Sequence, residues 1–374
     1  MKINICGDFT TVGKGNSAIV DGTALSDDII TLFKKSDFNI LNLESPVITD
    51  KTKAIKKSGP NLYTSEEAIK YIKSCGVNVV TLANNHFYDY GMHGIEKTLD
   101  ALKKYHINYV GGGVNKDEYS KIFYIEKDAI RVAILNYCES EFSVAGICGS
   151  NPINPINVYR DIQKAKINSD FIIIICHGGH EGYNLPSPRM KNLYRFFIEV
   201  GADLVCNHHQ HCFSGYEKYK NGAIFYGLGN FFFYDHRPQR RRSDLWNYGY
   251  ILSLNIATNG INYDIKPYVQ CKDNISTDLL NEAEKKIFFK NLEELSLVIK
   301  DDNKLNEQFN KWCRKQSNNI LTMFSPYDNR LFMALCRRGL LPNFLSSKKI
   351  VQLYNTIRCE SHNDLSINIL KQYM

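Results

Sequence analysis

The sequence Val-Asn-Val-Val-Thr-Leu-Ala-Asn-Asn-His at residues 77–86 decides the fold predicted for this chain. Its first six residues are rich in β-branched and apolar side chains, which indicates a strand, and Gly76 ends the preceding helix. Asn85 and His86 come directly after the strand. Because sites in parallel α/β sheets lie at the carboxyl ends of strands, these side chains predict a functional site at that edge.

The same alternation of strands and helices continues on both sides of this stretch. Strands are predicted over residues 3–6, 38–43, 77–82, 131–135, 171–176, 204–206, 223–226, 250–256 and 261–269. Helices are predicted over residues 26–35 and 94–105, from a capping box at 64–67 to Gly76, and from Ser187-Pro188 to Gly201. Residues 151–157, rich in Asn and Pro, predict a loop. This order implies right-handed crossovers, so we expect an α/β fold with a parallel core.

The pattern changes near residue 276, after which helical periodicity continues without a convincing strand. We therefore predict a main domain over residues 1–275 and a C-terminal helical appendage over residues 276–374. The helical part is interpreted as packed on the main domain, or alternatively as a surface for a membrane or a partner. No internal repeat is visible.

Length and composition exclude several classes of protein. The chain has 374 residues, of which 44 % are hydrophobic, and this excludes a largely disordered protein. A net charge of +7 is too weak to indicate a nucleic-acid partner. The eleven cysteines include no Cys-x-x-Cys pair, which favours buried thiols in a reducing compartment. We see no signal peptide or membrane span and expect a cytoplasmic protein, with membrane-peripheral attachment as the alternative.

Four other predicted strands are also followed by polar residues, which a parallel sheet would deliver to one edge. These residues are Asp8, Glu44, His177, and the pair His209 and His211. Carboxylate, amide and imidazole groups without cysteine favour Mn, Fe or Zn, one ion or two, and Glu44 can bridge a pair. An uncharged histidine beside them can protonate a leaving group. Alternation along an extended chain would point His209 and His211 the same way.

Five segments carry a resemblance to a known family. They are Asn42-Leu43-Glu44-Ser45-Pro46, the ten residues from Leu82 to Gly91, His177-Gly178-Gly179-His180-Glu181, Gly201-Ala202-Asp203 with residues 207–211, and Tyr226-Gly227-Leu228-Gly229-Asn230-Phe231. In this order they resemble the CapA family of bacterial capsule and poly-γ-glutamate synthesis, over roughly residues 1–270. The resemblance implies a fold similar to calcineurin-like metallophosphoesterases, with a four-layer core of mixed sheets between helices.

The resemblance also implies roles for single residues. Asp8 and His211 would bind a first metal, His177, His209 and Asn85 a second, Glu44 would bridge them, His86 would be the leaving-group acid, and Glu181 would act on substrate or support the site. The phosphoesterase pattern begins Asp-x-His, whereas the third position here is Thr10. One ligand of the first metal is therefore missing, which implies one metal, two with unequal affinity, or none.

A basic loop follows the Gly229-Asn230 segment and would hang near the same edge. It reads Tyr234-Asp235-His236-Arg237-Pro238-Gln239-Arg240-Arg241-Arg242. Arginine binds phosphates and carboxylates with two hydrogen bonds, so Arg237, Arg240 and Asn230 are candidate substrate-binding residues. A solvated surface turn is the alternative interpretation.

Two functions remain open. The first is metal-dependent hydrolysis of a phosphoester or an amide in an anionic small-molecule or polymer substrate of cell-surface metabolism, with His86 as proton donor. The second is a non-catalytic accessory subunit that works with polymer-synthesis proteins, which the missing ligand at Thr10 favours. Sequence does not separate phosphoester from amide chemistry.

Overall fold

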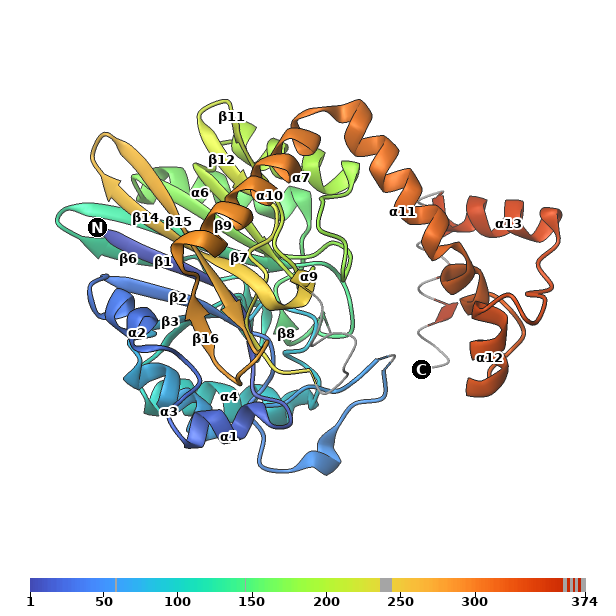
Figure 1. Cartoon of the computed structure of the whole chain (residues 1–374), viewed down its shortest axis with the longest axis horizontal. Helices are drawn as coiled ribbons and strands as arrows, with labels where there is room; N and C mark the ends of the chain where they lie inside the picture. Colours follow the sequence, from blue (N-terminus) through green and yellow to red (C-terminus); the bar gives the residue numbers. More distant parts are fainter. Residues whose placement is uncertain are drawn as a thin grey trace. The chain divides into compact units, whose positions relative to one another are not determined.

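The computed structural model describes residues 1–57, 59–144, 146–235, 244–358, 362–363, 366 and 369–370. The chain forms two compact units, residues 1–306 and residues 307–374 (Figure 1). The first unit contains the sheets and the candidate site, and the second is helical.

The first sheet of the larger unit is mixed. Its order is β16 (Thr277–Leu279), β15 (Gly260–Gln270), β14 (Tyr248–Ala257), β1 (Lys2–Thr10), β2 (Phe38–Leu43), β3 (Val79–Thr81) and β4 (Asn108–Val110), and β13 (Asn230–Phe233) also pairs with β1. Strands β1 to β3 run parallel, as predicted, β4 extends this parallel run without having been predicted, and β14 to β16 run antiparallel.

The second sheet supplies the other half of the core. Its order is β11 (Tyr216–Tyr219), β12 (Gly222–Phe225), β10 (Leu204–His208), β9 (Phe171–His177), β7 (Ile130–Cys138) and β6 (Phe123–Lys127). The four central strands are parallel and the two edge strands antiparallel. A small ladder joins β5 (Gly112–Gly113) to β8 (Gly149–Ser150).

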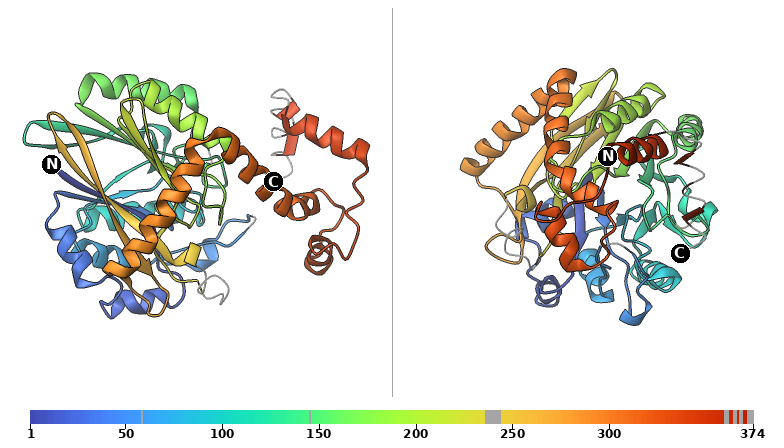
Figure 2. Two further views of the ribbon diagram at one scale, coloured as in Figure 1. Left: turned by 45° about the horizontal axis from the view of Figure 1, so that its top comes forward. Right: turned by 90° about the vertical axis from the view of Figure 1, so that its right-hand side faces the viewer.

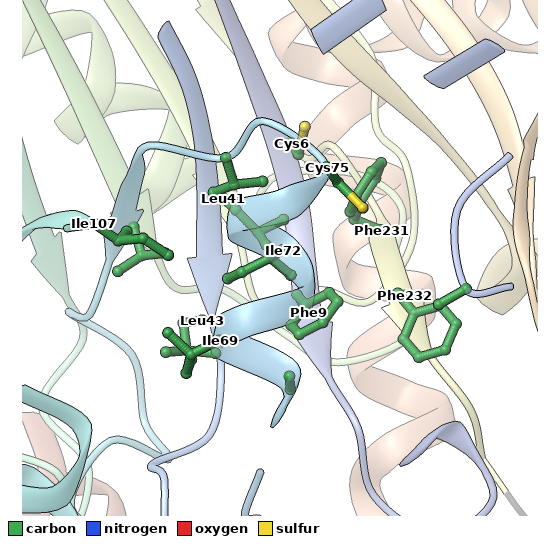
Figure 3. Close-up of a cluster of buried hydrophobic side chains, with 14 of the residues drawn as sticks. Cys6, Phe9, Leu41, Leu43, Ile69, Ile72, Cys75, Ile107, Phe231 and Phe232 are labelled. Atoms are coloured by element: carbon green, nitrogen blue, oxygen red, sulfur yellow. The ribbon is translucent and has the colours of Figure 1, made fainter. Parts of the chain in front are cut away.

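Helices cover the outer face of each sheet (Figure 2). On the first sheet lie α1 (Gly15–Val20), α2 (Asp27–Lys34), α3 (Glu66–Ser74) and α4 (Gly91–Lys104); on the second lie α6 (Pro155–Asn168) and α7 (Pro188–Glu199). Figure 3 shows Ile69 and Ile72 of α3 packed among side chains of the first sheet such as Leu41. A second apolar cluster lies between the two sheets. The α/β fold class and its four layers are therefore confirmed.

Local signals explain where several helices begin. The Ser65 hydroxyl accepts a hydrogen bond from the Ala68 backbone amide and caps α3. The helix start is therefore confirmed, but the cap lies one residue after Thr64, the N-cap of the predicted capping box. Ser187 caps α7, with Pro188 in the first turn. The loop predicted over residues 151–157 is wrong in its second half, because Asn154 caps α6 and Pro155 starts it.

The remaining elements are short or lie after the sheets. They are η1 (Lys51–Lys53), α5 (Lys116–Tyr119), α9 (Asp244–Asn247), α10 (Glu282–Lys300), α11 (Asp302–Met323), α12 (Arg330–Arg337) and α13 (Ser347–Arg358). Phe288 of α10 packs on Phe213, with ring centroids 4.5 Å apart. None of the described helices is long and apolar enough to cross a membrane. Ten cysteines lie in the described part of the chain, all free, and all but Cys313 are buried.

The region after residue 276 differs from its prediction. Strand β16 at residues 277–279 contradicts the expectation of no further strand; it is a three-residue edge strand, too short to produce an alternating pattern. Helix α10 also belongs to the first unit, which extends to Asn306. The predicted boundary at 275 thus lies inside this compact unit, because β16 completes the first sheet.

Candidate metal centre

Strand ends from both sheets meet at one place, and the predicted metal ligands lie together there. The first sheet supplies carboxylates and an amide, and the second supplies imidazoles. In chain order these residues are Asp8, Glu44, Asn85, His177, His209 and His211, all of them buried. The prediction of one edge of one sheet is therefore corrected to an edge shared by two sheets.

Two groups of three side chains hold their ligand atoms within 4.8 Å of one another. We call Asp8, Glu44 and His211 the Asp8 side, and Glu44, His177 and His209 the His177 side. Glu44 belongs to both, and its Oε1 lies 3.4 Å from His177 Nε2 and 3.7 Å from His211 Nε2. A carboxylate between two donor groups is where a bridging ligand of two ions would lie.

Glu44 provides the sharpest test of whether a metal fits. Its side chain is fully buried, and neither carboxylate oxygen has a hydrogen-bond partner among the described residues. Burial and then the nearby charge of Asp8 raise the pKa of Glu44 well above its ordinary value. A buried carboxylate without donors is unfavourable by several kcal/mol unless it is protonated or neutralised by a cation. The residues present therefore fit a divalent metal.

On the His177 side, an amide oxygen and a second imidazole lie close to His177. Its Nε2 lies 2.9 Å from Asn85 Oδ1 and 3.1 Å from His209 Nδ1. Burial, and then the neighbouring His209, lower the pKa of His177 well below its ordinary value. The ring is neutral, as metal ligation requires.

On the Asp8 side, the carboxylate and the imidazole neutralise each other. Asn42 Nδ2 donates to Asp8 Oδ1 at 2.7 Å, and His211 Nδ1 lies 3.4 Å from Asp8 Oδ2. Burial alone would raise the pKa of Asp8, but the hydrogen bond with His211 and the charges of nearby histidines outweigh it and hold that pKa below its usual range. Asp8 is therefore ionised.

His211 carries the matching positive charge. Burial lowers its pKa, but Glu44 and the hydrogen bond with Asp8 act more strongly together and raise it to about 10. Its Nδ1 donates to Asn230 Oδ1 at 2.9 Å, so loss of the other proton would leave Nε2 facing Glu44 as a ligand. A metal on the Asp8 side must displace that proton.

The backbone that presents His209 and His211 is not extended. Strand β10 ends at His208, and the two residues have φ values of 89° and 56°. The prediction from strand alternation is therefore wrong in its reason, although the two rings do lie close, with centroids 6.1 Å apart. Such left-handed residues cost about 1–3 kcal/mol each and persist where the surroundings hold them.

Gly7 makes the approach of β1 to the site possible. The pairing of β1 with β2 slips between Cys6 and Asp8, and the Asp8 amide donates to Gly229 O at 3.2 Å. A Cβ at position 7 would lie 1.8 Å from Gly229 O. Only glycine allows the two backbones to come so close, which places Asp8 opposite Asn230.

His86 is held by residues that the sequence analysis missed. Its Nδ1 lies 2.6 Å from Asp89 Oδ2, and Lys57 Nζ contacts both His86 Nδ1, at 3.1 Å, and Asp89. Asp89 also accepts the Leu62 amide at 2.6 Å, which folds the segment before it over the site. Burial lowers the pKa of His86, although Asp89 raises it. Asp89 follows His86 by only three residues, so the sequence could have predicted this contact.

A cavity of about 490 Å³ opens beside the donor groups. Asn85, His86 and His211 line it, together with the charged side chains Lys57, Glu141, Glu181 and Asp235. Glu181 thus lines the cavity, and its role on substrate or in supporting the site stays a prediction. Arg237 and Arg240 lie outside the described residues. Asn230 does not line the cavity; it is buried, and its amide nitrogen contacts the His211 and Trp246 carbonyls, so its geometry favours positioning His211 over contacting substrate.

Glu141 is a further residue that sequence reasoning missed. Its Oε1 lies 3.9 Å from His209 Nε2 at the cavity wall. The strand predicted over residues 131–135 continues to Cys138 as β7, so Glu141 follows a strand end like the other site residues. A strand predicted as far as Cys138 would have placed Glu141 shortly after a strand end and so marked it as a candidate.

Comparison with known proteins is consistent with this geometry. The family model described as bacterial capsule synthesis protein PGA_cap matches residues 2–235, which include every donor of both groups. The chain belongs to the PGA_cap family. The resemblance to CapA is thereby confirmed at the level of family.

Two curated CapA proteins resemble this PGA_cap chain. Capsule biosynthesis protein CapA of Bacillus anthracis is 37 % identical over 211 residues, which cover 54 % of this chain and 51 % of that protein. PGA biosynthesis protein CapA of Bacillus subtilis is 32 % identical over 224 residues, 58 % of either protein. The match thus spans little more than half the length of these relatives.

Solved structures are more distant from this PGA_cap chain. A hypothetical protein from Thermus thermophilus aligns with TM-score 0.47 and 13 % identity, over 72 % of this chain and 98 % of that one. A 5'-nucleotidase from Candida albicans aligns with TM-score 0.41 and 10 % identity, over 84 % and 58 %. Both scores are below 0.5, so the fold class rests on the chain's own sheets.

The Asp8 side of this PGA_cap chain lacks the imidazole that the Asp-x-His pattern would add. Thr10 is buried, and its hydroxyl donates to Ser45 Oγ at 2.9 Å. His208, which the sequence analysis left unassigned, is buried, and its Nδ1 lies 3.7 Å from Asp8 Oδ1. Neither of its ring nitrogens has a hydrogen-bond partner in the described part of the chain. The close metal donors on the Asp8 side are therefore those of Asp8, Glu44 and His211.

Proposed function

We propose that this PGA_cap protein is a metal-dependent hydrolase that cleaves a phosphoester or an amide in an anionic substrate of cell-surface polymer metabolism. The observation that carries the proposal is Glu44, whose two unpartnered, buried oxygens lie between two donor groups. The family and the names of its relatives, which concern capsule and PGA biosynthesis, support the polymer context.

The chain's residues divide the work of holding a divalent metal, Mn, Fe or Zn. Glu44 would be shared by two metal positions, Asp8 and His211 would complete one, and His177 and His209 with Asn85 would complete the other. A bound metal would polarise the scissile group and would make water ionise near neutral pH. The position that has four donors, His177, His209, Asn85 and the shared Glu44, is expected to bind a metal more tightly than the Asp8 side.

His86 is the proposed proton donor to the leaving group. It lines the cavity, and Asp89 holds its Nδ1, which leaves Nε2 as the exchanging atom. Lys57 Nζ forms an ion pair with the Asp89 carboxylate and so helps to hold it beside His86. Asp89 and Lys57 act as positioning residues in this scheme, since they touch His86 and not the donor groups.

A second candidate function is a non-catalytic accessory subunit of a polymer-synthesis complex. The observation that favours it is Thr10, which turns its hydroxyl to Ser45 and adds no ligand. Under this interpretation, the Asp8 side stays neutralised by its own ion pair and the site works without a metal.

Elemental analysis tests the proposal on protein purified without chelator, as wild type, His209→Ala, and the matched control His93→Ala from α4. We expect one or two equivalents of Mn, Fe or Zn in wild type and control, with loss in His209→Ala. Hydrolysis of phosphoester and γ-glutamyl amide substrates should follow metal content. Wild-type protein that binds no metal after reconstitution would contradict the hydrolase and leave the accessory subunit.

A further inference from the structure

The second unit, residues 307–374, has very little core. Among its described residues, Cys336 is the one hydrophobic side chain that is buried, and Thr322 Oγ1 contacts its sulfur at 3.4 Å. A small aromatic cluster of Tyr327, Phe332 and Phe344 adds partly exposed contacts. A unit of this size gains little stability from so small a core. The exposed apolar side chains of residues 307–374 therefore call for a role other than stabilising this unit.

Helix α13 carries those side chains as a continuous stripe. Ile350, Val351, Tyr354 and Ile357 stand at i, i+1, i+4 and i+7, which places them on one face of the helix. They are 41 %, 66 %, 59 % and 55 % exposed. We call these four residues the α13 stripe. A stripe this exposed is typical of a surface that meets an apolar environment.

Positive charge borders the apolar side chains. Lys348 and Lys349 occupy the first turn of α13, on the flanks of the stripe. Helix α12 repeats the pattern, with exposed Leu331 and Phe332 between Arg330 and Arg337. Residues 307–374 contain ten Lys and Arg against four Asp and Glu, so +6 of the chain's net charge of +7 resides in this unit.

We propose that the α12–α13 surface of the second unit docks on an anionic lipid bilayer. Exposed apolar side chains flanked by Lys and Arg are the features of helices that lie in a membrane interface. If two copies of the chain met through this surface, two units that each carry a net charge of +6 would repel each other, which disfavours self-association. A soluble polyanion would be attracted by the cations but would leave the α13 stripe in water.

Vesicle flotation of the full chain tests this surface. Vesicles of equal parts phosphatidylcholine and phosphatidylglycerol should carry the wild-type protein, and vesicles of phosphatidylcholine alone should not. Lys348→Gln with Lys349→Gln should weaken binding about 30-fold, since each cation near an anionic surface contributes about 1 kcal/mol. Val351→Asp with Ile357→Asp should abolish it, and added salt should weaken the wild type.

The matched control is Ile167→Asp, which changes an apolar residue of α6 that is 84 % exposed, outside the proposed surface. It should float like the wild type, and circular dichroism should show all variants folded. The proposal is overturned if the Asp variants of the α13 stripe float as well as the control, or if no protein floats. It is also overturned if the stripe instead mediates concentration-dependent dimers that the Asp variants abolish.

Discussion

The Asp8 side and the His177 side share Glu44 but solve opposite electrostatic problems. On the Asp8 side, a carboxylate and a protonated His211 already cancel each other, and Thr10 adds no ligand. On the His177 side, the ring of His177 is neutral and brings no charge to balance Glu44. The difference teaches that two donor groups of equal size need not bind metal equally, because the proton of His211 competes with a metal on the Asp8 side alone.

Glu44→Gln should have the largest effect because it removes the ligand common to both sides. We expect metal affinity to fall more than about 100-fold at both positions, beyond the losses usual for supporting residues, and hydrolysis to disappear. Isothermal titration with Mn²⁺ or Zn²⁺ measures the affinity, and thermal unfolding of the metal-free variant shows that it folds. Retention of one wild-type equivalent would show that Glu44 does not bridge.

His177→Ala and His211→Ala should separate the two sides. His211→Ala is expected to keep one equivalent of metal with affinity near the wild type, whereas His177→Ala should lose the tighter equivalent. Equilibrium dialysis followed by elemental analysis gives both numbers, with His93→Ala as control. If His211→Ala loses all metal, the sides are not independent and the comparison fails.

A pH series should sharpen the comparison. The pKa of His211 is raised to about 10, so a metal on the Asp8 side must displace its proton at neutral pH. Affinity on that side should rise about tenfold per pH unit up to the pKa. The pKa of His177 is lowered, so affinity on its side should change little from neutral pH upward. Titrations at several pH values would contradict this if both equivalents strengthened in parallel.

Asn230→Ala should have the smallest effect and act on the Asp8 side alone. It removes the acceptor that orients His211 Nδ1 while leaving every ligand in place. Loss of such a supporting group typically lowers metal affinity about 10–100-fold, and we expect a loss of roughly tenfold or more on this side. The titration should show the tighter equivalent unchanged, and equal weakening of both equivalents would argue for a general structural defect.

Much of the site was readable because apolar strands followed by polar residues are a local pattern. Asp8, Glu44 and His177 needed nothing more than strand ends and the rule that sites lie there. Glu141 was missed because the predicted strand stopped at 135, three residues before β7 ends. Lys57 was missed because its contact with His86 depends on a loop folded back by Asp89, and no local pattern encodes that closure.

The sequence by itself determined the α/β class, the family and the kinds of ligand, since periodicity and residue type act over a few positions along the chain. The tertiary structure decided that two sheets share the site and that left-handed backbone turns bring His209 and His211 together. It also decided which side is already neutralised. These properties depend on burial and on distances between residues far apart in the chain, because electrostatic interactions inside a protein follow position in space and not order in sequence.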